Sequence, residues 1–145
     1  MESTKVSDEE ILRGLQRRPK VKDGVTALLP VIGMMIGDPA GIGPEVCVRA
    51  AAAPELEGVC RTALIGDLGV VRRAADVCRL DLRFEPVSDP SQQLPVGMVG
   101  VVDPGGFDVE RCQFGKASVD SGNAVLQWMA RGEEMGRAGI LQGLV

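Results

Sequence analysis

Short apolar runs alternate along the chain with segments in which apolar residues recur at helical spacing. The first run, VIGMMI, is too short for a free-standing helix and is bounded by a turn, so it predicts a buried strand. Strands are predicted at residues 31–36, 60–65, 82–87 and 98–102, and helices from Pro44 onward and at 68–79 and 118–137. Strands that alternate with helices indicate an α/β fold with a mostly parallel sheet and right-handed crossovers.

The last helix and the segment after it complete the predicted domain. The inner face of the helix is expected to consist of Val125, Leu126, Trp128 and Met129. Residues 140–145 are expected to form a turn that leads into another strand. Because a buried parallel strand is seldom the last element of a domain, we expect residues 31–145 to be an α/β domain that is truncated at its C-terminus.

Residues 1–30 differ in character from this domain and are predicted to be an N-terminal extension. Ser7 and Glu10 have the spacing of a capping box, and a short apolar stripe follows them. A basic cluster at residues 17–22 comes next. The extension is interpreted as a frayed segment with one helix, or alternatively as an interaction arm or a targeting peptide. Its acidic residues count against a transit peptide.

Composition excludes several classes of function. A chain of 145 residues suits one domain, and no apolar run approaches the roughly 20 residues of a membrane span. A net charge of −4, three Phe and no Tyr offer nucleic acid neither a basic surface nor stacking platforms. The four cysteines form no C-x-x-C pair and are expected to be reduced, mostly buried thiols of a cytosolic protein. The chain has no histidine, so it cannot by itself build a histidine metal site or a Ser-His or Cys-His nucleophile.

The turn between the first strand and the first helix is the main candidate for a site. It contains three glycines that can adopt positive φ, at positions 37, 41 and 43, and Pro44 starts the helix that follows. A dinucleotide fingerprint would need a third glycine where Val46 stands. Asp38 and Glu45 also place negative charge beside the supposed phosphate cradle. We therefore favour a structural turn that shapes a cleft over a Rossmann phosphate site.

Other polar residues leave two interpretations open. Asp67 is interpreted as the cap of helix 68–79, with a ribose ligand as the alternative. Lys116 and Ser118 could hold a phosphate or carboxylate at a helix start, although a loop lysine and an N-cap serine explain them equally well. Asp103 and Asp108 fit an ordinary turn better than a metal site.

Two segments resemble a known family. The ten residues IGDPAGIGPE, from Ile36 to Glu45, are similar to the N-terminal signature of the 4-hydroxythreonine-4-phosphate dehydrogenases, and GKASVDSGNA, from Gly115 to Ala124, is similar to that family's Gly-Lys-x-Ser helix start. The resemblance implies a three-layer fold like that of the isocitrate and isopropylmalate dehydrogenases. It also implies NAD-dependent oxidation of a phosphorylated hydroxy acid, decarboxylation assisted by a divalent metal, and a homodimer for a full-length member.

The resemblance covers roughly the first third of a family member, and the metal-binding histidines and nicotinamide contacts of the family lie beyond it. No catalytic residue is therefore assigned, and neither NAD nor metal is expected to bind this chain alone. The candidates for lining a substrate cleft are Asp38, Pro39, Gly41, Gly43, Glu45, Lys116 and Ser118. The leading hypothesis is an N-terminal fragment of such a dehydrogenase, inactive alone. The alternatives are a non-catalytic small-ligand-binding or regulatory module, and a degenerate product without a stable fold.

Overall fold

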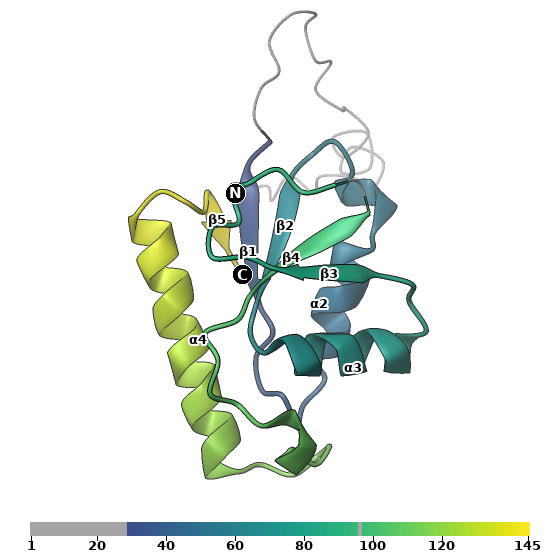
Figure 1. Cartoon of the computed structure of the whole chain (residues 1–145), viewed down its shortest axis with the longest axis vertical. Helices are drawn as coiled ribbons and strands as arrows, with labels where there is room; N and C mark the ends of the chain where they lie inside the picture. Colours follow the sequence, from purple (N-terminus) through teal and green to yellow (C-terminus); the bar gives the residue numbers. More distant parts are fainter. Residues whose placement is uncertain (1–28, 96) are drawn as a thin grey trace, which may run out of the picture.

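A five-stranded parallel sheet organises the part of the chain that this computed structural model describes, residues 29–95 and 97–145 (Figure 1). The elements are β1 (Val31–Met35), α2 (Gly43–Ala51), η1 (Pro54–Leu56), β2 (Arg61–Ile65), α3 (Leu68–Cys78), β3 (Arg83–Pro86), β4 (Met98–Val102), η2 (Val109–Arg111), α4 (Val119–Arg137) and β5 (Gly143–Leu144). The strand order is β3-β4-β2-β1-β5, and each neighbouring pair is parallel. The predicted α/β class is thus confirmed; the helix predicted for the N-terminal extension falls outside the described residues.

Helices lie on both sides of this sheet, with α4 on one side and α2 and α3 on the other (Figure 1). The core between them consists of strand residues such as Leu64, Ile65 and Val101, together with Trp128 and Met135 from α4, all fully buried. Gly132 lets α4 approach the sheet closely, and Gly33 makes room for the side chains that cover β1. A Cβ at Gly33 or at Gly132 would stand 3.1 Å from the Leu144 side chain.

The inner face of α4 differs from the predicted one. The buried residues are Ser121, Ala124, Trp128, Gly132 and Met135, which recur at spacings of three and four. Leu126 and Met129 are 66% and 48% exposed, so their assignment to the inner face was wrong. The helix turns by about 100° per residue. Because the large indole of Trp128 faces the sheet, Leu126 and Met129 are directed away from it.

The predicted strands are confirmed with small shifts at their ends. Met98–Val102 agrees in full, and β3 is an exposed edge strand on which Pro86 needs no further strand partner. The strand expected within residues 140–145 is the short β5, which pairs with β1. Val145 extends this pairing, because its N–H donates to Gly33 O at 2.9 Å and its carbonyl accepts from Met35 N at 2.8 Å.

The four cysteine thiols are less buried than the sequence predicted. All four cysteines are free, but each is only partly buried; Cys47 and Cys78 pack against the edge of the core from α2 and α3. Burial still raises the pKa of the Cys47 and Cys60 thiols.

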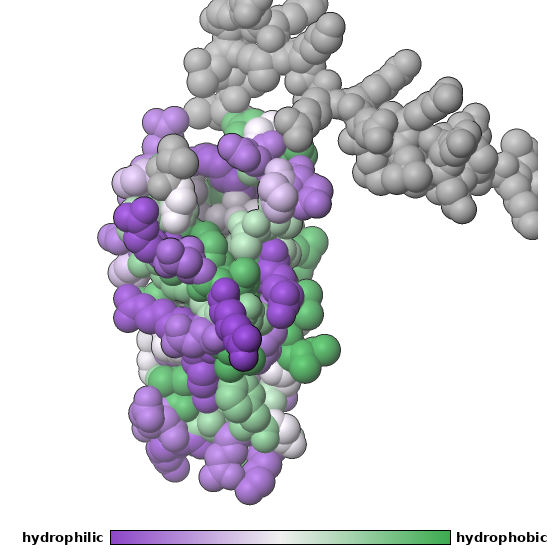
Figure 2. All heavy atoms as spheres, turned by 90° about the vertical axis from the view of Figure 1, so that its right-hand side faces the viewer, coloured by the Kyte–Doolittle hydropathy of each residue, from purple (hydrophilic) through white to green (hydrophobic). Residues whose placement is uncertain are grey.

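On the face of the molecule in Figure 2, hydrophilic and apolar side chains are interspersed. Among the described helices, none has both the length and the apolar character that crossing a bilayer requires.

Candidate ligand-binding cleft

The carboxyl ends of three adjacent strands meet at one edge of the sheet. Met35 is in register with Ile65, and Ile65 with Val102, so β1, β2 and β4 end together. Three connections leave this edge: the glycine turn that precedes α2, the Gly66-Asp67 corner, and the long loop of residues 103–118. Ligands of open α/β folds bind outside the carboxyl ends of the strands. This edge is therefore the place to look for a site.

The glycine turn is held by its own hydrogen bonds. The carboxylate of Asp38 accepts from Ala40 N at 2.8 Å, and its carbonyl accepts from Gly41 N at 3.0 Å. Of the three glycines expected to adopt positive φ, only Gly37 does so, at +68°. Gly43 is needed for a different reason, because a Cβ there would collide with the carbonyl oxygen of Ile36. The glycines thus permit a sharp turn and close packing of the helix start on β1.

Two carboxylates accept hydrogen bonds from backbone N–H groups in the first turn of α3. Asp67 is the N-cap, as predicted, and accepts from Val70 N at 2.8 Å. Asp103, which follows β4, accepts from Leu68 N at 2.9 Å and from Gly105 N at 2.8 Å. The bond to Gly105 confirms the turn predicted at Asp103, whereas its contact with α3 was not foreseen, because no local pattern connects residues 35 positions apart. Desolvation by burial raises the pKa of Asp67, and the charge of Asp103 adds to this shift.

We expect the pKa of Asp67 to appear in the pH dependence of stability. Since the folded-state pKa is raised, the folded protein keeps a proton on Asp67 in the pH range just above 3.8, where the unfolded chain has lost it. The stabilisation contributed by this proton is present at lower pH and is lost as pH rises through the folded pKa. Asp67→Asn keeps a capping oxygen but does not titrate.

The measurement is urea unfolding followed by Trp128 fluorescence over a pH series. Wild type should gain free energy of unfolding relative to Asp67→Asn as the pH falls through that range. Asp67→Ala, which lacks a cap, should lose about 1 kcal/mol at pH 7. Parallel pH profiles for wild type and Asp67→Asn would show that the carboxyl is not perturbed.

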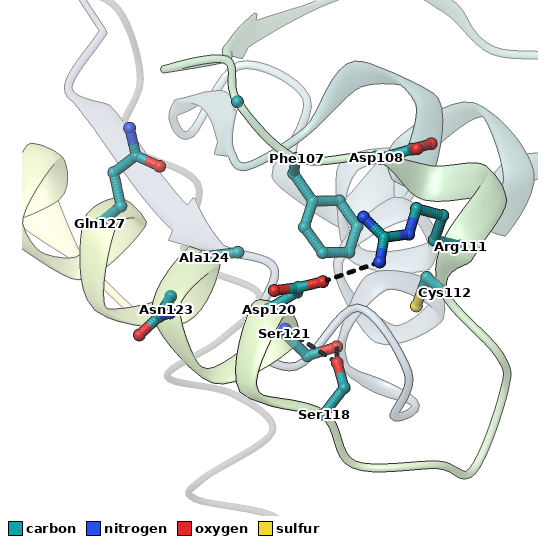
Figure 3. Close-up of a pocket in the computed structure, with 11 residues that line it drawn as sticks. Phe107, Asp108, Arg111, Cys112, Ser118, Asp120, Ser121, Asn123, Ala124 and Gln127 are labelled. Atoms are coloured by element: carbon teal, nitrogen blue, oxygen red, sulfur yellow. Dashed lines mark hydrogen bonds and ion pairs between the residues drawn. The ribbon is translucent and has the colours of Figure 1, made fainter.

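A pocket of about 480 Å³ opens between the loop after β4 and the first half of α4 (Figure 3). Its lining residues are Gly106, Phe107, Asp108, Arg111, Cys112, Ser118, Asp120, Ser121, Asn123, Ala124 and Gln127. Arg111 pairs with Asp120 at 4.0 Å, and both side chains are exposed. Most of the lining residues are polar. The carboxylates of Asp108 and Asp120, with the single cation Arg111, leave the lining with one net negative charge. Hydroxyl and amide groups on a ligand would find partners here, while a phosphate group would meet two carboxylates.

Ser118 and Lys116 have structural roles at the start of α4. Ser118 is the N-cap, and its Oγ accepts from Ser121 N at 3.0 Å and lies 2.9 Å from Ser121 Oγ. Lys116 Nζ donates to Gln113 Oε1 at 2.8 Å. Both residues therefore behave as the loop-and-cap interpretation predicts. Ser118 alone of the seven predicted cleft residues also lines the pocket.

The two segments that carry the family resemblance, residues 36–45 and 115–124, lie side by side. Gly115 N donates to the carbonyl of Ala40 at 2.8 Å, which joins the loop to the glycine turn. The turn residues Asp38, Gly41 and Glu45 do not line the pocket. The amides of Asn123 and Gln127 were not among the predicted site residues, although their i, i+4 spacing places both on one face of α4.

The described residues do not fit the metal or the dinucleotide that the resemblance implies. In residues 29–95 and 97–145, no group of three or more Cys, Asp or Glu side chains is arranged to hold a metal ion. The best-placed carboxylates, Asp67 and Asp103, are already engaged by backbone N–H groups. At the glycine turn, Asp38 and Glu45 carry negative charge and Pro44 lacks an N–H donor, so the turn does not suit a pyrophosphate. No step of a reaction can therefore be derived through either group from these residues.

The parallel sheet, the crossover helices and the turn at the carboxyl edge define the class as an open α/β domain. No family model matches the chain. Over 116 residues it is 34% identical to a putative D-threonate 4-phosphate dehydrogenase of Symbiobacterium thermophilum. These residues make up 79% of this chain and 35% of that protein. Over 108 residues it is 32% identical to the 4-hydroxythreonine-4-phosphate dehydrogenase of Trichlorobacter lovleyi. These residues make up 73% of this chain and 32% of that protein.

Solved structures agree with these sequence relationships. The crystal structure of a 4-hydroxythreonine-4-phosphate dehydrogenase from Burkholderia phymatum matches with a TM-score of 0.74 and 30% identity, over 80% of this chain and 35% of that one. A terephthalate 1,2-cis-dihydrodiol dehydrogenase from Burkholderia xenovorans matches with a TM-score of 0.62 and 28% identity, over 79% and 32%. The chain is thus a homologue of the 4-hydroxythreonine-4-phosphate dehydrogenases and spans about a third of their length.

Proposed function

We propose that the chain is the N-terminal part of an NAD-dependent and metal-dependent dehydrogenase that oxidises and decarboxylates a phosphorylated hydroxy acid resembling 4-hydroxythreonine 4-phosphate. The observation that carries this proposal is the agreement in sequence and fold with such dehydrogenases, which extends over only about a third of each relative. In this proposal the chain alone is inactive, because its described residues contain no group of three or more Cys, Asp or Glu side chains arranged to hold the metal.

The chain contributes one wall of the substrate cleft in this proposal. The turn residues Asp38–Glu45 and the neighbouring Lys116 and Ser118 face the polypeptide that supplies the histidine ligands and nicotinamide contacts. We further propose that the full-length assembly is a homodimer in the cytosol, a compartment that suits four free thiols.

The direct test is an assay of the purified 145-residue protein with NAD, a divalent metal and either 4-hydroxythreonine 4-phosphate or 4-phosphothreonate. We expect no formation of NADH above the rate without protein. The Burkholderia phymatum enzyme, assayed under the same conditions, is the positive control. Turnover by this chain alone would contradict the proposal, because it would require catalytic groups that the described residues do not provide.

A second candidate function is a non-catalytic small-ligand-binding or regulatory module, which the polar pocket beside α4 favours. In this function the hydroxyl or amide groups of a phosphorylated hydroxy acid or a nucleotide occupy the pocket, while the phosphate stays outside it. The ligand then raises the melting temperature in proportion to the logarithm of its concentration. Trp128, the only tryptophan, contacts Phe107 of the pocket with ring centroids 5.8 Å apart, so its fluorescence can report the same binding. A saturable change in Trp128 fluorescence, together with thermal stabilisation and without turnover, would favour this module over the fragment.

A further inference from the structure

Arg73 on α3 connects segments that lie far apart in the sequence. Its Nη2 donates to the carbonyl of Pro39 at 2.9 Å, in the glycine turn. Its Nη1 donates to the carbonyl of Cys112 at 3.1 Å and, at 3.4 Å, to that of Val109. The guanidinium also lies 4.3 Å from the ring centre of Phe114. One side chain thus joins α3, the turn and the loop after β4.

The chemistry of arginine suits this arrangement. A guanidinium presents several donors in a rigid plane and stacks on aromatic rings, whereas a lysine ammonium is a single point donor on a flexible stem. Hydrogen bonds from a charged donor are stronger than those between neutral groups. Arg73 takes part in none of the ion pairs found among the described residues, so its charge is directed at backbone carbonyls.

The partners of Arg73 lie in the walls of the candidate cleft. Cys112 lines the pocket, and Pro39 is a buried residue of the turn. The backbone hydrogen bond from Gly115 N to Ala40 O is a second link between the same two segments. Loss of Arg73 would leave the long loop attached to the turn by that backbone link. The segment around Cys112 would lose its hydrogen bonds to α3, and the loop would stay hydrogen-bonded to α3 only at its start, through Asp103 and Leu68 N.

We propose that Arg73 is a positioning residue for the candidate cleft, which holds the glycine turn and the wall of the pocket at a fixed separation from α3. The inference rests on the proposed function only in treating this edge of the sheet as the ligand site. The positioning itself is a property of the free protein and can be measured without ligand, metal or turnover.

The experiment compares wild type, Arg73→Ala, Arg73→Lys and the matched control Arg72→Ala, whose side chain is exposed on the same helix. Trypsin cleavage under native conditions is followed by mass at Arg111 and Lys116, which lie in the loop, and at Arg61, which lies in β2. Trp128 emission gives a second readout, because Phe107 of the loop packs against the indole. Urea unfolding of each variant gives its global stability.

For Arg73→Ala we expect loop cleavage at Arg111 and Lys116 to rise about tenfold or more, with a red shift of Trp128 emission and unchanged cleavage at Arg61. Arg73→Lys should recover less than half of the protection, and Arg72→Ala should match wild type. Two results would overturn the inference: loop cleavage that stays at the wild-type rate, or cleavage that rises equally at Arg61 and Arg111. The second result would mean that Arg73 supports the whole fold rather than the cleft. Neither result depends on whether the chain belongs to an active dehydrogenase.

Discussion

Gly43→Ala is expected to lower the free energy of unfolding by about 3 kcal/mol, because the helix start leaves no room for a Cβ. The added atom would collide with the carbonyl oxygen of Ile36 and stand 3.3 Å from its carbonyl carbon. Both atoms belong to the backbone of the segment that ends β1, so neither can move aside as a flexible side chain would. Relief requires α2 to shift away from the sheet. Urea unfolding followed by Trp128 fluorescence measures the loss.

Gly122→Ala is the matched control, since it adds the same methyl group to another helix. A Cβ at Gly122 would meet nothing within 4 Å, and the residue is exposed in α4. Alanine is a better helix former than glycine, so this variant should gain up to about 1 kcal/mol. If both variants changed stability in the same direction and by similar amounts, close packing at Gly43 would not be the reason for its glycine.

The second large effect is expected at Trp128, whose replacement by alanine should reduce the free energy of unfolding by about 3–5 kcal/mol. Trp128 is 1% exposed and is the largest fully buried side chain of the described residues. Truncation would leave a cavity between α4 and the sheet and remove the edge-on contact with Phe107, at 73° between ring planes. Because the fluorophore is lost, unfolding is followed by far-UV circular dichroism.

Leu126→Ala and Met129→Ala are the controls on the same helix, and each should change stability by no more than about 0.5 kcal/mol because both side chains are largely exposed. Trp128→Phe should lose less than Trp128→Ala, since it keeps a ring and removes an indole N–H that has no hydrogen-bond partner among the described residues. A loss at Leu126 as large as that at Trp128 would restore the inner face predicted from the sequence.

The candidate site could be predicted only in part. The resemblance and the local motif located the turn at the carboxyl end of β1, and the caps at Asp67 and Ser118 followed from residue type and position alone. The pocket residues Phe107, Asn123 and Gln127 escaped prediction, as did Arg73 and the hydrogen bond of Asp103 to α3. The hydrogen bonds that Arg73 and Asp103 make to distant backbone groups leave no trace in the residues beside them.

The sequence by itself determined the order and type of the elements, because apolar spacing, capping residues and glycine-proline turns act over a few neighbouring positions. It also determined that any histidine-dependent chemistry must come from elsewhere, since the chain has none. Only the tertiary structure decided which face of α4 is buried, since Trp128 and Gly132 pack against the sheet while Leu126 faces outward. It alone brought Pro39, Cys112 and Arg73 together, because packing in three dimensions joins groups whose separation along the chain carries no local signal.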